Sequence, residues 1–130
     1  MKAFACLTLV IPALVAQAAR IVQSNDDGWA ELYLRSFNDA LNEAGHDVVL
    51  SAPADNQSGT EPCEYDSCIG NGSTTGHNDT RPDLNWINSF PVTAMKYGID
   101  TFGPQLWNGS APEFAVAGPN VGTNVFVQLP

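Results

Sequence analysis

The stretch from Arg20 to Pro53 constrains the fold of this chain more than any other stretch. It opens with a short apolar strand at Ile21 and Val22 and closes with a second apolar strand, Asp47–Pro53. Between them, residues 30–44 carry apolar side chains at spacings of three and four, which predicts a helix with one buried stripe. The stripe comprises Tyr33, Phe37, Ala40, Leu41 and Ala44. A strand, a helix and a strand in succession form a βαβ unit with parallel strands, so we expect an α/β fold.

The second half of the chain continues the alternation of strands and helices. Residues 84–90 suggest a short strand, and Pro91 suits the first turn of a helix that ends at Gly103-Pro104. Helical spacing predicts a buried face made of Val92, Met95, Ile99 and Phe102. Phe114–Ala117 follows as a third strand of a parallel sheet, in which we expect it to be central. Residues 54–82 lack periodicity and are predicted to form an exposed, elaborated loop rather than a core element.

Two adjacent carboxylates, Asp26 and Asp27, follow the first strand directly. Gly28 can close their turn with a positive φ angle. Like charges this close oppose local folding unless a cation or a set of hydrogen-bond donors neutralises them, and a bound divalent metal is the simplest remedy. The alternative is a solvated β-turn over residues 25–28, because all four residue types favour turns.

Unusual polar turns follow three of the predicted strands, at residues 25–28, 55–59 and 118–120. Ligands of open parallel sheets bind outside the carboxyl ends of the strands, so we expect these turns to converge on one edge. The donors available there are carboxylates, a hydroxyl and an amide, with no thiolate or imidazole nearby in the sequence. Such oxygen ligands suit Mg²⁺, Mn²⁺ or Ca²⁺.

Residues 1–18 have the pattern of a cleaved secretory signal peptide. Lys2 precedes an apolar run over residues 3–15, and the run ends in Ala16-Gln17-Ala18, a small-x-small cleavage pattern. The alternative, a membrane anchor, requires about 20 apolar residues, and the run is shorter. We therefore expect a secreted protein whose single domain comprises residues 19–130.

Sequons and cysteines agree with secretion. Asn-x-Ser/Thr acceptors occur at Asn56, Asn71, Asn78 and Asn108. We expect glycans at the last three, because Asn56 lies two residues from Ser58. Removal of the signal removes Cys6, and Cys63 can then pair with Cys68 in an oxidising compartment. A zinc site built on the two cysteines would need more ligands than a distant His77 can supply.

The chain resembles the survival protein SurE family. Four motifs carry the resemblance, and their order and approximate spacing match from Arg20 to Asn124, nearly all of the chain after the signal. The motifs are Ser24-Asn25-Asp26-Asp27-Gly28, Ser51-Ala52-Pro53 leading to Gln57-Ser58-Gly59, Pro91-Val92-Thr93-Ala94-Met95-Lys96-Tyr97-Gly98, and Ala117-Gly118-Pro119-Asn120. The signal, cysteine pair and sequons resemble a secreted, acid phosphatase-like branch. The resemblance implies a Rossmann-like three-layer αβα fold with a mostly parallel sheet.

The resemblance also implies a chemistry, because members of the family are metal-dependent phosphatases and nucleotidases. Carried over residue by residue, it makes Asp26, Asp27, Ser58 and Asn120 the metal ligands, with Asp26 and Asp27 as the catalytic pair. Asn25, Ser58, Gly59 and Asn124 would contact the substrate. The implied reaction is hydrolysis of a phosphate monoester, such as a nucleoside monophosphate, by water activated on Mg²⁺ or Mn²⁺.

Other function classes fit less well. A phosphorelay receiver needs an aspartate where this chain has Gly118-Pro119-Asn120, and a dinucleotide-binding domain needs Gly-x-Gly-x-x-Gly after its first strand. The net charge of −9 argues against nucleic acid and anionic membranes as partners.

A last alternative keeps the fold but lacks activity. The family domain normally continues beyond the Gly-Pro-Asn turn through a loop, further helices and strands and an oligomerisation arm. We therefore expect the C-terminal part of the domain to be missing, which predicts a secreted glycoprotein with a metal half-site and weak or no hydrolysis. The family's homo-oligomer is doubtful for such a chain.

Overall fold

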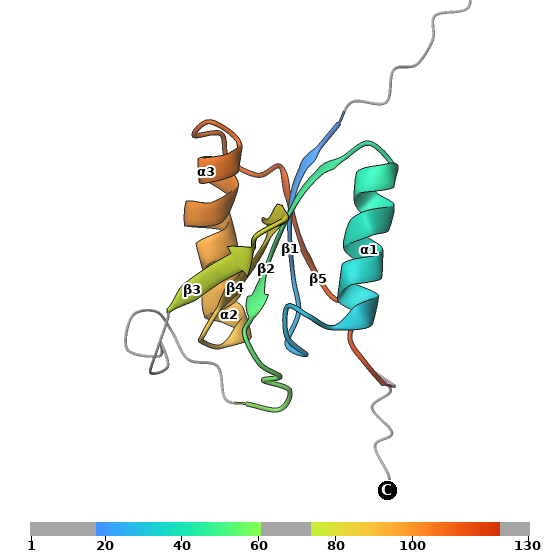
Figure 1. The fold of residues 1–130 in the computed structure, drawn as a ribbon, viewed down its shortest axis with the longest axis vertical. Helices are drawn as coiled ribbons and strands as arrows, with labels where there is room; N and C mark the ends of the chain where they lie inside the picture. Colours follow the sequence, from blue (N-terminus) through green and yellow to red (C-terminus); the bar gives the residue numbers. More distant parts are fainter. Residues whose placement is uncertain (1–17, 61–73, 123–130) are drawn as a thin grey trace, which may run out of the picture.

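The computed structural model describes residues 18–60 and 74–122. They form a three-layer αβα arrangement around a five-stranded sheet of order β3-β4-β2-β1-β5 (Figure 1). The strands are β1 (Arg20–Ser24), β2 (Asp47–Pro53), β3 (Thr75–Asn78), β4 (Arg81–Ile87) and β5 (Phe114–Ala117). The strands β4, β2, β1 and β5 are parallel, and β3 is antiparallel to β4. The predicted α/β fold with a mostly parallel sheet is therefore confirmed.

Helices cover both faces of the sheet. Helix α1 (Leu32–Glu43) lies on one face, and a continuous helical segment made of α2 (Pro91–Tyr97), the π-helical turn η1 (Gly98–Phe102) and α3 (Gly103–Leu106) lies on the other (Figure 1). Each face has its own core. Val22, Val49, Phe102 and Trp107 form the core on the α2 side, and Leu34, Leu50, Ala52 and Leu84 form the core on the α1 side. Val49 and Leu50 belong to opposite cores, as alternation along a strand requires.

The predicted buried stripe of α1 is wrong by one position. Tyr33 is 57% exposed and Phe37 is 37% exposed, whereas Leu34 and Asn38 are fully buried. Ala40 and Ala44 are also exposed, and Leu41 is half-buried. The stripe that contacts the sheet contains a polar residue, Asn38, so a search for apolar spacing alone selected the neighbouring stripe. The helix begins at Leu32, where the Glu31 carboxylate caps it by accepting a hydrogen bond from the Leu34 N–H at 2.8 Å.

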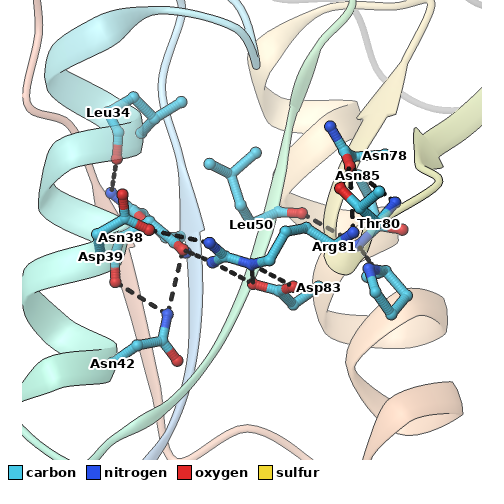
Figure 2. A network of polar contacts seen from close by, with 12 residues as sticks. Leu34, Asn38, Asp39, Asn42, Leu50, Asn78, Thr80, Arg81, Asp83 and Asn85 are labelled. Carbon is cyan, nitrogen blue, oxygen red and sulfur yellow. Dashed lines mark hydrogen bonds and ion pairs between the residues drawn. The ribbon is translucent and has the colours of Figure 1, made fainter.

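A polar network holds α1 against β4 (Figure 2). The Arg81 guanidinium donates to Asp83 at 2.7 Å, to Asn38 Oδ1 at 3.0 Å and to Asp39 at 3.1 Å. The hydrogen bonds to Asp83 and Asp39 raise the pKa of Arg81 above its usual value. The network also supplies the buried Asn38 oxygen with a charged donor, which explains how α1 can direct an amide toward the sheet.

The sequence predicted a loop over residues 54–82, but only part of this range is a loop. They contain β3 and the first two residues of β4, which form a hairpin. Asn78 closes its turn by accepting hydrogen bonds from the N–H groups of Thr80 and Arg81. Gly76 lies against Trp86 so closely that a Cβ there would be 2.2 Å from the ring. A four-residue strand whose packing depends on a glycine has no apolar periodicity to detect.

The helix that begins at Pro91 ends later than predicted, and its buried face differs from the predicted one. It continues through Gly103-Pro104 to Leu106, because proline is tolerated in the first turn of α3. Phe102 is buried as expected, but Val92 is 53% exposed. The π-helical turn shifts the register, so a stripe drawn at α-helical spacing does not stay on one face. Met95 and Ile99 are half-buried.

Strand β5 matches its predicted bounds but lies at the edge of the described sheet rather than at its centre. Its first residue, Phe114, is 61% exposed. Most of the predicted signal peptide (residues 1–17), Cys63, Cys68, Asn71 and Asn124 lie outside the described residues. Within the described residues, the helices are too short or too polar to cross a membrane.

Candidate functional site

The Asp27 carboxylate joins three loops that are far apart in the sequence. Its Oδ1 accepts hydrogen bonds from the Ser58 hydroxyl at 2.9 Å and from the Asn56 amide at 3.3 Å. Its Oδ2 accepts one from the Val121 N–H at 2.7 Å. These donors follow β2 and β5, while Asp27 follows β1. The expected convergence of the three polar turns on one edge of the sheet is thus confirmed.

Backbone contacts fix the turn that carries the two aspartates. Gly28 has a φ of +105°, and a Cβ there would be 3.3 Å from the Asp55 carbonyl carbon. The Trp29 N–H donates to the Pro53 carbonyl at 2.8 Å, and the Gln57 N–H donates to the Asp26 carbonyl at 2.7 Å. The turn therefore lies tightly against the loop after β2, and only glycine suits the position.

The turn after β5 is attached to the end of β1. Gly118, with a φ of +104°, donates its N–H to the Ser24 carbonyl at 2.7 Å, and the Gly118–Pro119 peptide bond is cis. Beyond it, the Asn120 side chain is exposed and lines the same cavity as Asp26, a space of about 710 Å³. Asp26, Asp27, Ser58 and Asn120 thus lie at one edge, while the roles given to them by resemblance stay predictions.

The two aspartates differ in their surroundings. Both oxygens of the Asp27 carboxylate already accept hydrogen bonds, from the Asn56 amide, the Ser58 hydroxyl and the Val121 N–H. Asp26 lines the cavity, and its carboxylate has no hydrogen-bond partner among residues 18–60 and 74–122. Of the pair, Asp26 is therefore the carboxylate with unused ligand capacity.

The residues present fit a hard divalent cation. Two carboxylates, the Ser58 hydroxyl and the Asn120 amide offer oxygen ligands at this edge, which is the set that Mg²⁺ and Mn²⁺ prefer. The described part of the chain contains no cluster of three or more His, Cys, Asp or Glu side chains, so a metal here would depend on the two neutral oxygens as well as on the aspartates.

The predicted substrate contacts fall into three groups. Asn25 is buried at the edge, and its Oδ1 accepts a hydrogen bond from the Gly28 N–H at 3.2 Å. Gly59 is exposed in the loop after β2, with a φ of +73°. Asn124 lies outside the described residues.

Sequence reasoning missed two parts of this region. The Val121 contact is made by a backbone N–H, which no side-chain pattern can reveal. Val92, interpreted from its spacing as core, lines the cavity instead, whereas Met95 and Ile99 line the cavity and also pack against the core on the α2 side. Helical spacing is the same for a core face and for a cavity wall, so no signal in the sequence separated the two.

This chain is similar to known proteins in sequence and in fold. An acid phosphatase of Yarrowia lipolytica (strain CLIB 122 / E 150) is 30% identical over 118 residues, which cover 81% of this chain and 33% of the relative. This chain thus spans about a third of the length of that protein. The crystal structure of the SurE protein from Aquifex aeolicus superposes with a TM-score of 0.64 at 21% identity, covering 82% of this chain and 39% of that one, which shows a shared fold. The pattern of the family described as "Survival protein SurE" matches residues 21–129, so the chain belongs to the SurE family.

Proposed function

We propose that this protein hydrolyses phosphate monoesters with the help of a divalent cation bound at the Asp26–Asp27 edge. The observation that carries the proposal is the meeting of three strand-end loops on Asp27, with Asp26 and Asn120 lining one adjoining cavity. The family and the acid phosphatase relative support a phosphate monoester as the substrate class. Nucleoside monophosphates are the finer expectation.

The chain's own residues would hold the metal and the phosphate. Asp26 and Asp27 supply charge, and Ser58 and Asn120 supply neutral oxygens. A bound Mg²⁺ or Mn²⁺ would polarise the phosphoryl oxygens and lower the pKa of a coordinated water. Asn25, whose amide orientation is set by Gly28, would contact the substrate.

Ser58 is better suited to binding than to nucleophilic attack. Its hydroxyl donates to the Asp27 carboxylate at 2.9 Å, and the described residues place no histidine within hydrogen-bonding distance of it. An activated serine normally requires such a base. The reaction we propose therefore needs no covalent intermediate.

We also propose that the protein is secreted as a glycoprotein after removal of residues 1–18, with a Cys63–Cys68 disulfide. The signal pattern and the sequons support this localisation. Asn108 is exposed in a turn with a φ of 52°, and this exposure is what a glycosylated asparagine requires.

A second candidate is a member of the family that binds the metal but turns over substrate weakly or not at all. One observation favours it: within the described residues, Lys96 is the one cationic side chain that lines the cavity. A site with a single cationic side chain offers few donors to the phosphoryl transition state, and each donor that a site lacks costs about a hundredfold or more in rate.

The experiment is hydrolysis of p-nitrophenyl phosphate by residues 19–130, with Mg²⁺ or Mn²⁺ and with EDTA. Metal-dependent turnover that disappears in Asp26→Asn supports the first candidate. The matched control is Asp79→Asn, an exposed aspartate of the β3–β4 turn that does not line the cavity. Turnover that persists in EDTA, or that is equal in both variants, would refute a metal-dependent reaction at Asp26. Metal binding without turnover would select the second candidate.

A further inference from the structure

The cavity beside the acidic edge has two unlike surfaces. It is bounded by the carboxyl ends of β1 and β5 and by the α2–η1 segment. The polar residues Ser24, Asn25 and Asp26 lie on one side of its lining. Val92, Met95 and Ile99 form an apolar wall on the other side, and Lys96 and Asp100 line the cavity from the same α2–η1 segment. Its volume of about 710 Å³ falls within the roughly 300–1,000 Å³ of small-molecule sites.

Two buried polar atoms in the lining residues lack partners. Ser24 is 2% exposed and Asn25 is 4% exposed, and neither Ser24 Oγ nor Asn25 Nδ2 has a hydrogen-bond partner among the described residues. The Asn25 oxygen already accepts from the Gly28 N–H, which leaves the Nδ2 donors unused. Buried polar groups are normally paired, so two such atoms in one cavity lining require an explanation.

A phosphate group would supply what these atoms lack. Its oxygens are acceptors, and both Ser24 Oγ and Asn25 Nδ2 can donate. The apolar wall requires a different partner, because Val92 is 53% exposed and stands beside the polar groups. A ligand that satisfies both surfaces has an anionic head and an apolar body.

We propose that this cavity selects phosphomonoesters with an apolar, ring-sized organic group. The Ser24 hydroxyl and the Asn25 amide donate to the phosphoryl oxygens, and Val92, Met95 and Ile99 contact the organic group. This inference rests on the proposed function, because it takes the phosphate to bind at the same edge. It adds Ser24 as a binding residue and the α2–η1 segment as the determinant of substrate preference.

The test uses phosphonates, which cannot be hydrolysed, so that binding is measured without turnover. Titration calorimetry with residues 19–130 in excess Mn²⁺ compares phenylphosphonate with methylphosphonate. Burial of the ring against the wall should make phenylphosphonate bind about tenfold more tightly. Equal affinities, or no binding of either compound, would overturn the inference.

Variants of the wall locate the preference. Val92→Asn and Met95→Gln should each reduce the preference to about threefold or less, because each replaces apolar contact area with a polar amide. Leu32→Asn is the matched control, since Leu32 is 70% exposed on α1 and does not line the cavity. A preference that survives both wall variants, or that Leu32→Asn also removes, would contradict the assignment.

Ser24→Ala tests the polar part. Removing an unpaired buried hydroxyl should leave the melting temperature unchanged or raise it, and both phosphonates should bind about fivefold more weakly. Ser51→Ala is the control, because the Ser51 hydroxyl donates to the Ala94 carbonyl at 2.6 Å and its loss should lower the melting temperature without weakening phosphonate binding. Unchanged affinity in Ser24→Ala would remove Ser24 from the site.

Failure of this inference differs from failure of the proposed function. Metal-dependent hydrolysis with equal affinities for the two phosphonates would refute only the selection of an apolar group. A tenfold phosphonate preference without hydrolysis would refute only the turnover.

Discussion

Asp26 and Asp27 are adjacent in the sequence but occupy different environments. The Asp27 carboxylate accepts three hydrogen bonds from two loops, and that of Asp26 accepts none from the described residues. The sequence predicted the pair and its place at a strand end. It could not predict that Asp27 accepts hydrogen bonds and Asp26 does not, because the donors to Asp27 come from residues 29 to 94 positions away.

Asp27→Asn should therefore destabilise the protein more than Asp26→Asn. An amide cannot accept at both of its ends, so either the Ser58 hydroxyl or the Val121 N–H loses its acceptor, at a cost of about 1 kcal/mol. Thermal unfolding in EDTA measures this without a contribution from metal. Equal losses of stability in the two variants would contradict the assigned hydrogen bonds.

Asn56 should carry no glycan, although Asn56-Gln57-Ser58 is a formal acceptor. Its Nδ2, the atom that a glycan would modify, donates to Asp27 at 3.3 Å, and its Oδ1 accepts from the Ser58 N–H at 2.8 Å. Mass spectrometry of glycopeptides from the secreted protein measures occupancy, with the exposed Asn108 as the internal comparison. Full occupancy at Asn56 would mean that Ser58 is not part of a working site.

At the scale of elements, β2 and β5 were predictable, whereas β3 and the faces of the helices were not, and β4 begins and ends three residues before the predicted range 84–90. Both β2 and β5 match their expected bounds, because short apolar runs bounded by proline or glycine have few alternatives. The contact face of α1 depends on Asn38 and on its pairing with Arg81, 43 residues away. The face of α2 depends on a π-helical turn that brings Gly98 against Val22, where a Cβ would be 2.5 Å from the valine side chain. Both are tertiary effects that override local periodicity.

A pair of substitutions tests the orientation of α1. Leu34→Ala should lower the free energy of unfolding by about 2–5 kcal/mol, because it leaves a cavity under a fully buried side chain. Tyr33→Ala, on the exposed stripe, should change it by less than about 0.5 kcal/mol. Urea denaturation gives both values, and the reverse order would restore the stripe predicted from spacing.

At the scale of the whole molecule, several large apolar side chains remain exposed in the described part. Tyr33, Phe114 and Val121 are each more than half exposed, and Phe114 lies on β5 at the edge of the described sheet. Exposed apolar surface beside an open strand edge favours association. The match covers only 33% of the length of the Yarrowia relative, so most of that protein has no counterpart in the matched region.

An extended protein should therefore be more stable and more active than residues 19–130 alone. In a fusion that joins the unmatched part of the Yarrowia acid phosphatase to this chain, we expect the added residues to cover the exposed side chains of β5 and to supply further donors to the phosphate. Melting temperature and metal-dependent hydrolysis of p-nitrophenyl phosphate are compared in parallel. Equal values in the two proteins would show that the shorter chain is sufficient by itself.

The central claim is that Asp26 and its neighbours bind a divalent cation at the carboxyl edge of the sheet. Titration calorimetry of residues 19–130 with Mn²⁺ tests it most directly, because it requires neither substrate nor turnover. Asp26→Asn should weaken binding by at least about tenfold, while Asp79→Asn leaves it unchanged. Equal Mn²⁺ affinity in the unmodified protein and in Asp26→Asn would contradict the claim.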